Sequence, residues 1–170
     1  MKIDNGGDGL VAARHMKFFG YKPAIYYPKQ PDRQHLKDLV KQSIACDIPF
    51  IEAIPDDVDK EFDLVIDAIF GFSFKGDIRE PFLTAITKIK QSGIPIVSVD
   101  VPSGWNVDLG DTSGGKAFSE PQVRALVSLT APKLCAAEFK GVHYLGGRFV
   151  PDSILEKYKC RPPVHYQGSA

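Results

Sequence analysis

Two aspartates lie where an apolar run of the sequence gives way to a loop rich in glycine or serine. Asp67 lies within LVIDAIF (64–70), and Asp100 lies near the end of IPIVSVDV (94–101). Such runs are typical of strands covered on both faces of a parallel sheet, and the carboxyl ends of these strands form the crevice where ligands bind. Burying a carboxylate is costly unless a cation or a hydrogen-bond donor meets it. The pair therefore predicts a functional site; the alternative for either residue alone is a cap of a turn or helix.

The loop after the first aspartate is a second candidate. It combines two glycines, two aromatic rings and opposite charges, and consists of Gly71, Phe72, Ser73, Phe74, Lys75, Gly76 and Asp77. One interpretation is a loop that folds over a flat, phosphate-bearing ligand, with Lys75 as a phosphate partner or proton donor. The other is an ordinary surface loop whose two aromatic side chains pack into the core.

A third candidate is the glycine-rich segment NGGDG, which comprises Asn5, Gly6, Gly7, Asp8 and a further glycine. Successive glycines let a ligand approach the backbone closely, and the start of a helix attracts anionic groups. The segment is neither the GxGxxG dinucleotide fingerprint nor a P-loop. The alternative is a plain turn in which Asp8 caps the helix that follows.

The oxygen-bearing side chains near these loops suit a hard cation better than a nucleophilic enzyme. Ser103 follows Asp100 by three residues, but VDVPSGW lacks the G-x-S-x-G pattern of a nucleophile elbow, and no histidine is placed to activate the serine. Asn5, Asp67 and Ser103 supply oxygen ligands only. Such ligands suit alkali or alkaline-earth ions.

Helical and strand patterns alternate along the chain. Helices are predicted near 8–20, 36–44, 82–89, 134–139 and 153–159, and strands near 23–28, 64–70, 94–101 and 123–129, with a brief apolar segment at 48–54. Thr130 ends the last of these strands within SLTAPK, and Lys133 follows it. His143 and Tyr144 are predicted as packing or turn residues, before a glycine turn at 146–147. Alternating strands and helices predict a parallel α/β sheet, in a single domain over 1–160 with a loose tail over 161–170.

Composition excludes several classes of function. The 21 basic and 21 acidic residues of the 170 give no net charge and form no basic stripe, so no nucleic-acid partner is expected. No apolar run approaches the roughly 20 residues of a membrane span, and MKIDNGGDG resembles neither a signal nor a transit peptide. Three widely spaced cysteines (46, 135 and 160) are typical of reduced thiols, and the four histidines show no metal-ligand spacing.

Together, NGGDG, DAIFGFSFKGDIREP, VDVPSGW, SLTAPK and YLGGRFVP resemble the NAD(P)H-hydrate epimerase family, also described as the YjeF N-terminal domain and as apolipoprotein A-I binding protein. The resemblance extends from Asn5 to about Tyr158. It implies a three-layer, Rossmann-like αβα fold with a mostly parallel sheet, a homodimer, and the interconversion of R and S forms of NADHX and NADPHX, which are hydrated nicotinamide cofactors.

The resemblance also implies roles for particular residues. Asn5 to Asp8 and Gly71 to Asp77 would contact the hydrated dinucleotide, with Asp100 at the nicotinamide ring. Asn5, Asp67 and Ser103 would hold a potassium ion, in agreement with their oxygen-only chemistry. We hypothesise that Asp100 is the general acid or base and that Lys75 assists it.

The front of the chain departs from the family pattern, because Asp4 stands where the first asparagine of the motif is expected and the first strand is apparently missing. A rival function is therefore a non-catalytic binding module of the same fold, with apolipoprotein A-I or a component of RNA decapping as its partner. An ordinary NAD-dependent dehydrogenase is disfavoured by the lack of GxGxxG. Family resemblance leaves a mitochondrial, cytosolic or secreted location open.

Overall fold

The structure is a computed structural model that describes residues 5–146 and 149–159. Its helices are α1 (Asn5–Phe18), α2 (Gln34–Ala45), α3 (Val58–Glu61), α4 (Phe82–Ser92), the 3₁₀ helix η1 (Leu134–Glu138) and α5 (Asp152–Lys157). Its strands are β1 (Ile25–Tyr26), β2 (Phe50–Ile51), β3 (Val65–Asp67), β4 (Ile96–Val99), β5 (Val123–Leu129) and β6 (Val142–Gly146). The predicted tail over 161–170, Cys160 and Gly147 lie outside the described residues.

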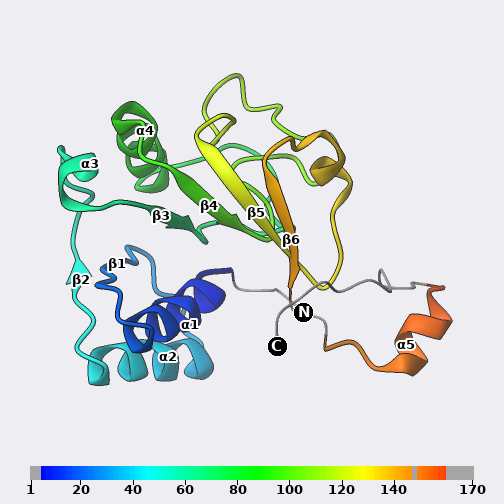
Figure 1. Cartoon of the computed structure of the whole chain (residues 1–170), viewed down its shortest axis with the longest axis horizontal. Helices are drawn as coiled ribbons and strands as arrows, with labels where there is room; N and C mark the ends of the chain where they lie inside the picture. Colours follow the sequence, from blue (N-terminus) through cyan, green and yellow to red (C-terminus); the bar gives the residue numbers. More distant parts are fainter. Residues whose placement is uncertain (1–4, 147–148, 160–170) are drawn as a thin grey trace.

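The strands form two parallel sheets (Figure 1). One has four strands in the order β3-β4-β5-β6, and the other pairs β1 with β2. The four pairings between these strands are parallel, and Asp67 of β3 lies opposite Ser98 of β4. The prediction of a parallel α/β sheet is confirmed. In Figure 1, α4 lies above the strands while α1 and α2 lie below them.

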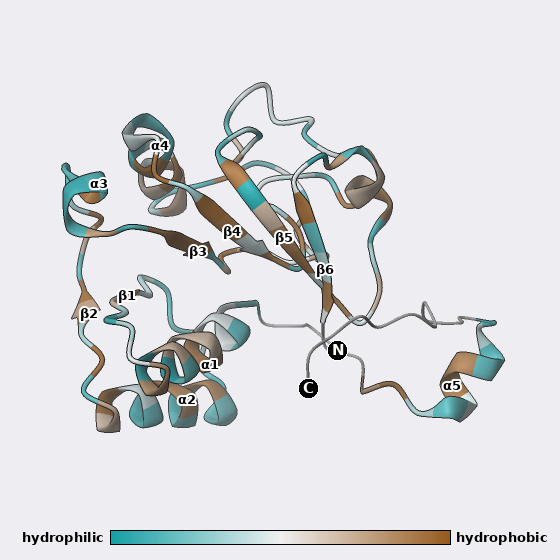
Figure 2. Cartoon of the chain, in the orientation of Figure 1, coloured by the Kyte–Doolittle hydropathy of each residue, from teal (hydrophilic) through white to brown (hydrophobic). Residues whose placement is uncertain are grey.

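Apolar residues on both faces explain why the larger sheet forms. Ile96 of β4, Leu126 of β5 and Ile86 of α4 are almost fully buried in one large cluster, and Figure 2 shows apolar colour along β3, β4 and much of β5. A second, smaller cluster joins α1 to β1 through residues such as Leu10 and Ile25. The α4 helix ends at Gly93, whose φ of 72° is the left-handed conformation that glycine adopts at little cost.

The start of α1 differs from the prediction. The helix begins at Asn5, so Asp8 lies in its first turn and is not the cap that the sequence suggested. A Cβ on Gly6 would lie 2.9 Å from the Tyr27 ring, and one on Gly9 would lie 2.8 Å from the Ala68 Cβ. These glycines therefore serve helix packing, and they bring the positive end of α1 to the carboxyl ends of β3 and β4.

The strand β6 is a further correction. His143 and Tyr144, predicted as packing or turn residues, lie in this strand, which pairs with β5 from Val142 to Gly146. Its alternation is weak because the side chains of its first three residues are exposed. No helix among the described residues is long and apolar enough to cross a membrane.

Candidate functional site

Asp67 is the most completely bonded side chain at the carboxyl edge of the sheet. It ends β3, and only 1% of its surface is exposed. Its Oδ1 accepts hydrogen bonds from the Ser103 hydroxyl (2.5 Å) and the Ile69 N–H (3.3 Å), and its Oδ2 accepts from the Ser98 hydroxyl and the Ser103 N–H (both 2.8 Å). The carboxylate thus joins β3, β4 and the loop after β4.

Burial and hydrogen bonding act in opposite directions on this carboxyl. Burial raises the pKa of Asp67 because it penalises the charged form, while the bonds from Ser103, Ser98 and Ile69 lower it. The effect of burial is the larger, so the pKa lies above its ordinary value. A cation near this carboxylate would favour its ionised form.

Asp100 is held at both of its carboxylate oxygens. The residue follows β4 and is 3% exposed. Its Oδ2 accepts a hydrogen bond of 2.9 Å from the Phe72 N–H, and its Oδ1 is paired with the Lys133 ammonium. A Cβ on Gly71 would lie 3.0 Å from Asp100 Oδ2, so glycine at 71 leaves the room in which this carboxylate sits.

Asp100 and Thr130 occupy matching turns at the ends of neighbouring strands. Their φ angles are 72° and 70°. In each case the residue after the turn donates its N–H two residues back, from Val101 to the Val99 carbonyl (2.9 Å) and from Ala131 to the Leu129 carbonyl (2.8 Å). These are γ-turns with positive φ, a rare and strained conformation. Strain of this kind often accompanies functional positions.

Asn5 brings helix α1 to the same edge. Its side-chain amide donates to the Phe70 carbonyl (2.9 Å) and the Val99 carbonyl (3.1 Å). Its Oδ1 is buried and has no hydrogen-bond partner among residues 5–146 and 149–159. Leaving a buried oxygen without a donor is costly, so this oxygen is a candidate ligand for a cation.

The loop 71–77 divides between core and surface. Phe74 stacks on Phe70 with ring centroids 4.3 Å apart, and both Phe72 and Phe74 pack against the main core. Ser73, Lys75, Gly76 and Asp77 are exposed. The packing of the two aromatic rings therefore agrees with the interpretation of an ordinary surface loop. Lys75 makes no hydrogen bond or ion pair within the described part of the chain and does not meet Asp100.

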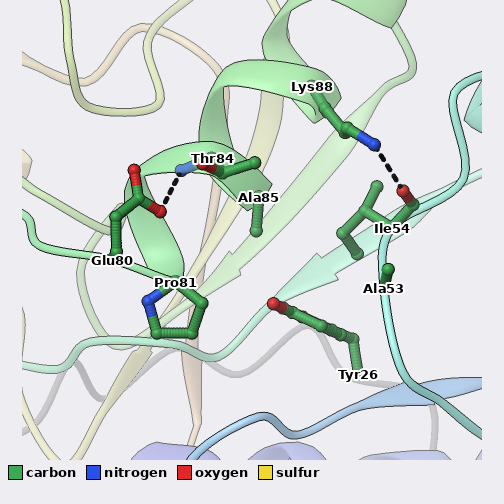
Figure 3. A pocket seen from close by; sticks show the side chains of 8 residues that line it. All are labelled: Tyr26, Ala53, Ile54, Glu80, Pro81, Thr84, Ala85 and Lys88. Carbon is green, nitrogen blue, oxygen red and sulfur yellow. Dashed lines mark hydrogen bonds between the residues drawn. The ribbon is translucent and has the colours of Figure 1, made fainter.

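A separate cavity of about 220 Å³ lies between β1 and the start of α4 (Figure 3). Its charged side chains are Glu80 and Lys88, and Lys88 already donates to the Ile54 carbonyl (3.1 Å) and pairs with Asp56. Burial, together with the charge of Glu80, raises the pKa of Tyr26 at its edge. None of the predicted site residues lines this cavity, so the strand-end cluster remains the stronger candidate site.

The three predicted cation ligands, Asn5, Asp67 and Ser103, fit a hard monovalent cation in part. The Asn5 Oδ1 is a buried oxygen without a partner in the described part of the chain, and the Ser103 hydroxyl, which accepts from the Phe70 N–H at 2.9 Å, is fully buried. Asp67 already accepts four hydrogen bonds, so it offers charge more readily than an open lone pair. No cluster of three histidine, cysteine or acidic side chains that could hold a metal occurs among residues 5–146 and 149–159.

A sequence model of the family described as YjeF-related protein N-terminus matches residues 2–135. This chain belongs to that family. Membership of this family supports NAD(P)H-hydrate epimerase activity at the family level. Enzymes of the family use potassium. The crystal structure of the yeast protein YNL200c (ynu0) is similar, with 39% sequence identity and a TM-score of 0.79. The match covers 97% of this chain and 70% of the yeast chain. The Rossmann-like fold is confirmed.

Two members of the cluster were not among the predicted site residues. Lys133 was noted only for its place after Thr130, although a lysine close behind a strand end can reach the same crevice. Ser98 is the one polar residue between Ile94 and Val99, and a hydroxyl in such an apolar run signals a buried partner. The structure supplies that partner, because Ser98 donates to Asp67.

Proposed function

We propose that this chain interconverts the R and S forms of hydrated NADH and NADPH, with Asp100 as the residue that transfers protons. The observation that carries the proposal is the Asp100 carboxylate. It is buried at the carboxyl edge of the sheet, fixed at both oxygens and packed so closely on Gly71 that a Cβ there would lie 3.0 Å from Oδ2. Membership of the YjeF-related N-terminus family supplies the substrate class.

Epimerisation at the hydroxyl-bearing ring carbon can proceed by loss and re-addition of water. The carboxyl of Asp100 gives a proton to the hydroxyl, the carbon–oxygen bond breaks, and the electron pair of the adjacent ring nitrogen forms a carbon–nitrogen double bond. Water then adds to the opposite face, and Asp100 takes a proton back. Atoms and charge balance, and no oxidant is needed. Such acid–base catalysis contributes about 10²- to 10⁴-fold.

The surrounding residues would bind and orient the substrate. The start of α1, from Asn5 to Asp8, directs a positive dipole end toward the carboxyl ends of β3 and β4, which suits the diphosphate. The exposed residues of the loop 71–77, above all Lys75, supply polar contacts to the rest of the dinucleotide. Phe72 contributes its N–H to Asp100, and its ring is partly buried against the core.

Potassium is proposed at Asn5, Asp67 and Ser103. Two features favour a cation there: the Oδ1 of Asn5, which has no partner among the described residues, and the buried carboxyl of Asp67. A bound ion would neutralise the Asp67 carboxylate and hold the loops after β3 and β4 in place.

The proposal is tested by proton NMR of the pure R epimer in potassium buffer. The expected result is that signals of the S epimer grow much faster with protein than in buffer alone. A folded protein that leaves the rate at that of buffer contradicts the proposal and favours the non-catalytic binding module.

A further inference from the structure

We propose that Lys133, and not Lys75, is the lysine that works with Asp100, as a positioning residue that stabilises the carboxylate formed when Asp100 releases its proton. This inference rests on the proposed epimerase function. It replaces the sequence-based assignment of Lys75 as the assisting group.

The contacts of Lys133 single it out. Its ammonium pairs with Asp100 Oδ1 and donates to the Leu129 carbonyl at 2.7 Å. The same nitrogen lies 5.8 Å from the centroid of the Phe72 ring, within the range of a cation–π contact. The Lys133 side chain is 16% exposed, while that of Lys75 is exposed and unpaired within the described residues. Only Lys133 is therefore fixed on the carboxylate.

The local chain explains how Lys133 reaches back to the site. The γ-turn at Thr130 reverses the chain after β5, and Pro132 then fixes its own φ angle. On the far side, η1 begins at Leu134, and the Cys135 N–H donates to the Val107 carbonyl at 3.0 Å. The backbone of Lys133 is thus held between two anchored segments, and the bond to the Leu129 carbonyl holds its ammonium beside Asp100.

The two partners of Asp100 fix the orientation of its carboxylate. Lys133 occupies one oxygen and the Phe72 N–H occupies the other, so the group cannot rotate freely. Each oxygen keeps a further lone pair for a proton. As Asp100 gives up its proton, negative charge develops beside an ammonium that is already in place. Preorganised charge of this kind stabilises a transition state without reorganisation.

The experiment compares kcat and KM for the R epimer in the parent, Lys133→Met, Lys133→Arg, Lys75→Met and the matched control Lys140→Met. We expect Lys133→Met to lose about 100-fold in kcat with KM within about threefold, because the lost interaction strengthens as negative charge develops on Asp100 in the transition state and does not involve the substrate directly. Lys133→Arg, which keeps the charge but displaces it, should lie between Lys133→Met and the parent. Lys75→Met should raise KM and not lower kcat, since Lys75 is a proposed substrate contact that does not touch Asp100. Lys140→Met should change neither by more than about threefold, since Lys140 is exposed and precedes β6 at the opposite edge of the sheet.

A kcat for Lys133→Met within about threefold of the parent overturns the inference while the proposed function stands. A parent protein that is folded but inactive overturns both together. If Lys133→Met alone fails to fold, the Asp100→Asn/Lys133→Met double variant shows whether the unpaired charge is the cause, and Lys133→Arg carries the kinetic test. In that case a kcat equal to that of the parent overturns the inference, and a fall of about tenfold or more at unchanged KM supports it.

Discussion

The hydrogen bond from Ser98 to Asp67 gives a quantitative prediction about what holds the site together. Ser98 is fully buried and donates at 2.8 Å to a carboxylate that is itself 1% exposed. A hydrogen bond to a charged group contributes about 1.5–3 kcal/mol. Ser98→Ala should therefore lower the free energy of unfolding by about 2 kcal/mol.

Ser128→Ala is the matched control. Ser128 is also fully buried in a central strand, but its hydroxyl meets the exposed ring of His143 at 2.9 Å. Its partner can turn to water when the hydroxyl is removed. The cost should therefore be about 1 kcal/mol or less.

Urea unfolding followed by the fluorescence of Trp105, the single tryptophan, measures both variants. Trp105 is buried and donates its ring N–H to the Phe118 carbonyl at 2.6 Å, so unfolding changes its surroundings. With an m-value of about 2 kcal/mol/M, Ser98→Ala should lower the midpoint by about 1 M. The Ser98 bond lowers the pKa of Asp67, so its loss should matter most above that pKa and fade as Asp67 is protonated. Equal midpoints for Ser98→Ala and Ser128→Ala near neutral pH would refute this reasoning.

Three further predictions concern the same edge of the sheet. Gly71→Ala should lower kcat about tenfold with little change in stability, because the new Cβ would lie 3.0 Å from Asp100 Oδ2. Gly146→Ala is the control, because its new Cβ would lie 3.4 Å from the nearest atom. At position 130, glycine should be more stable than alanine by about 1 kcal/mol in urea unfolding, the reverse of the usual order, because φ is 70°; equal stability would contradict a strained turn. Burial raises the pKa of Asp67 in the folded state. The stability that this carboxyl contributes is therefore complete below the pKa of the unfolded state and is lost as pH rises through the pKa of the folded state. Potassium at ten times the Kd that it has at about pH 8 should raise the free energy of unfolding by about 1.4 kcal/mol at that pH. The same potassium concentration should raise it by less at about pH 5, where Asp67 is more often protonated. Lithium serves as the control, and an equal effect of the two ions would count against the site.

Much of the architecture could be predicted from sequence patterns. The strand over 123–129 was predicted with its observed bounds, because its apolar residues and β-branched valines leave no competing helical period. The strand β6 was not, since its early side chains are exposed and its stability comes from pairing with β5. The two-sheet arrangement likewise depends on pairings between residues far apart in the chain, which no local pattern encodes.

The candidate site was predictable in outline and not in its contacts. Asp67 and Asp100 were found because a carboxylate in an apolar run is conspicuous. The choice between Lys75 and Lys133 as the partner of Asp100 could not be made, because it depends on the γ-turn at Thr130. The sequence gives no sign that Thr130 takes a positive φ, since threonine seldom adopts that conformation.

The central claim is most directly tested by a coupled assay on the parent and Asp100→Asn. Each protein is mixed with the R form of NADHX, potassium and an excess of a dehydratase that restores only the S form, and the return of NADH is followed. We predict rapid recovery with the parent and a loss of about 100-fold or more with Asp100→Asn, whose side chain has the same size but cannot transfer the proton. Equal recovery by both proteins would contradict the assignment of Asp100, and no recovery by a folded parent would contradict the epimerase function itself.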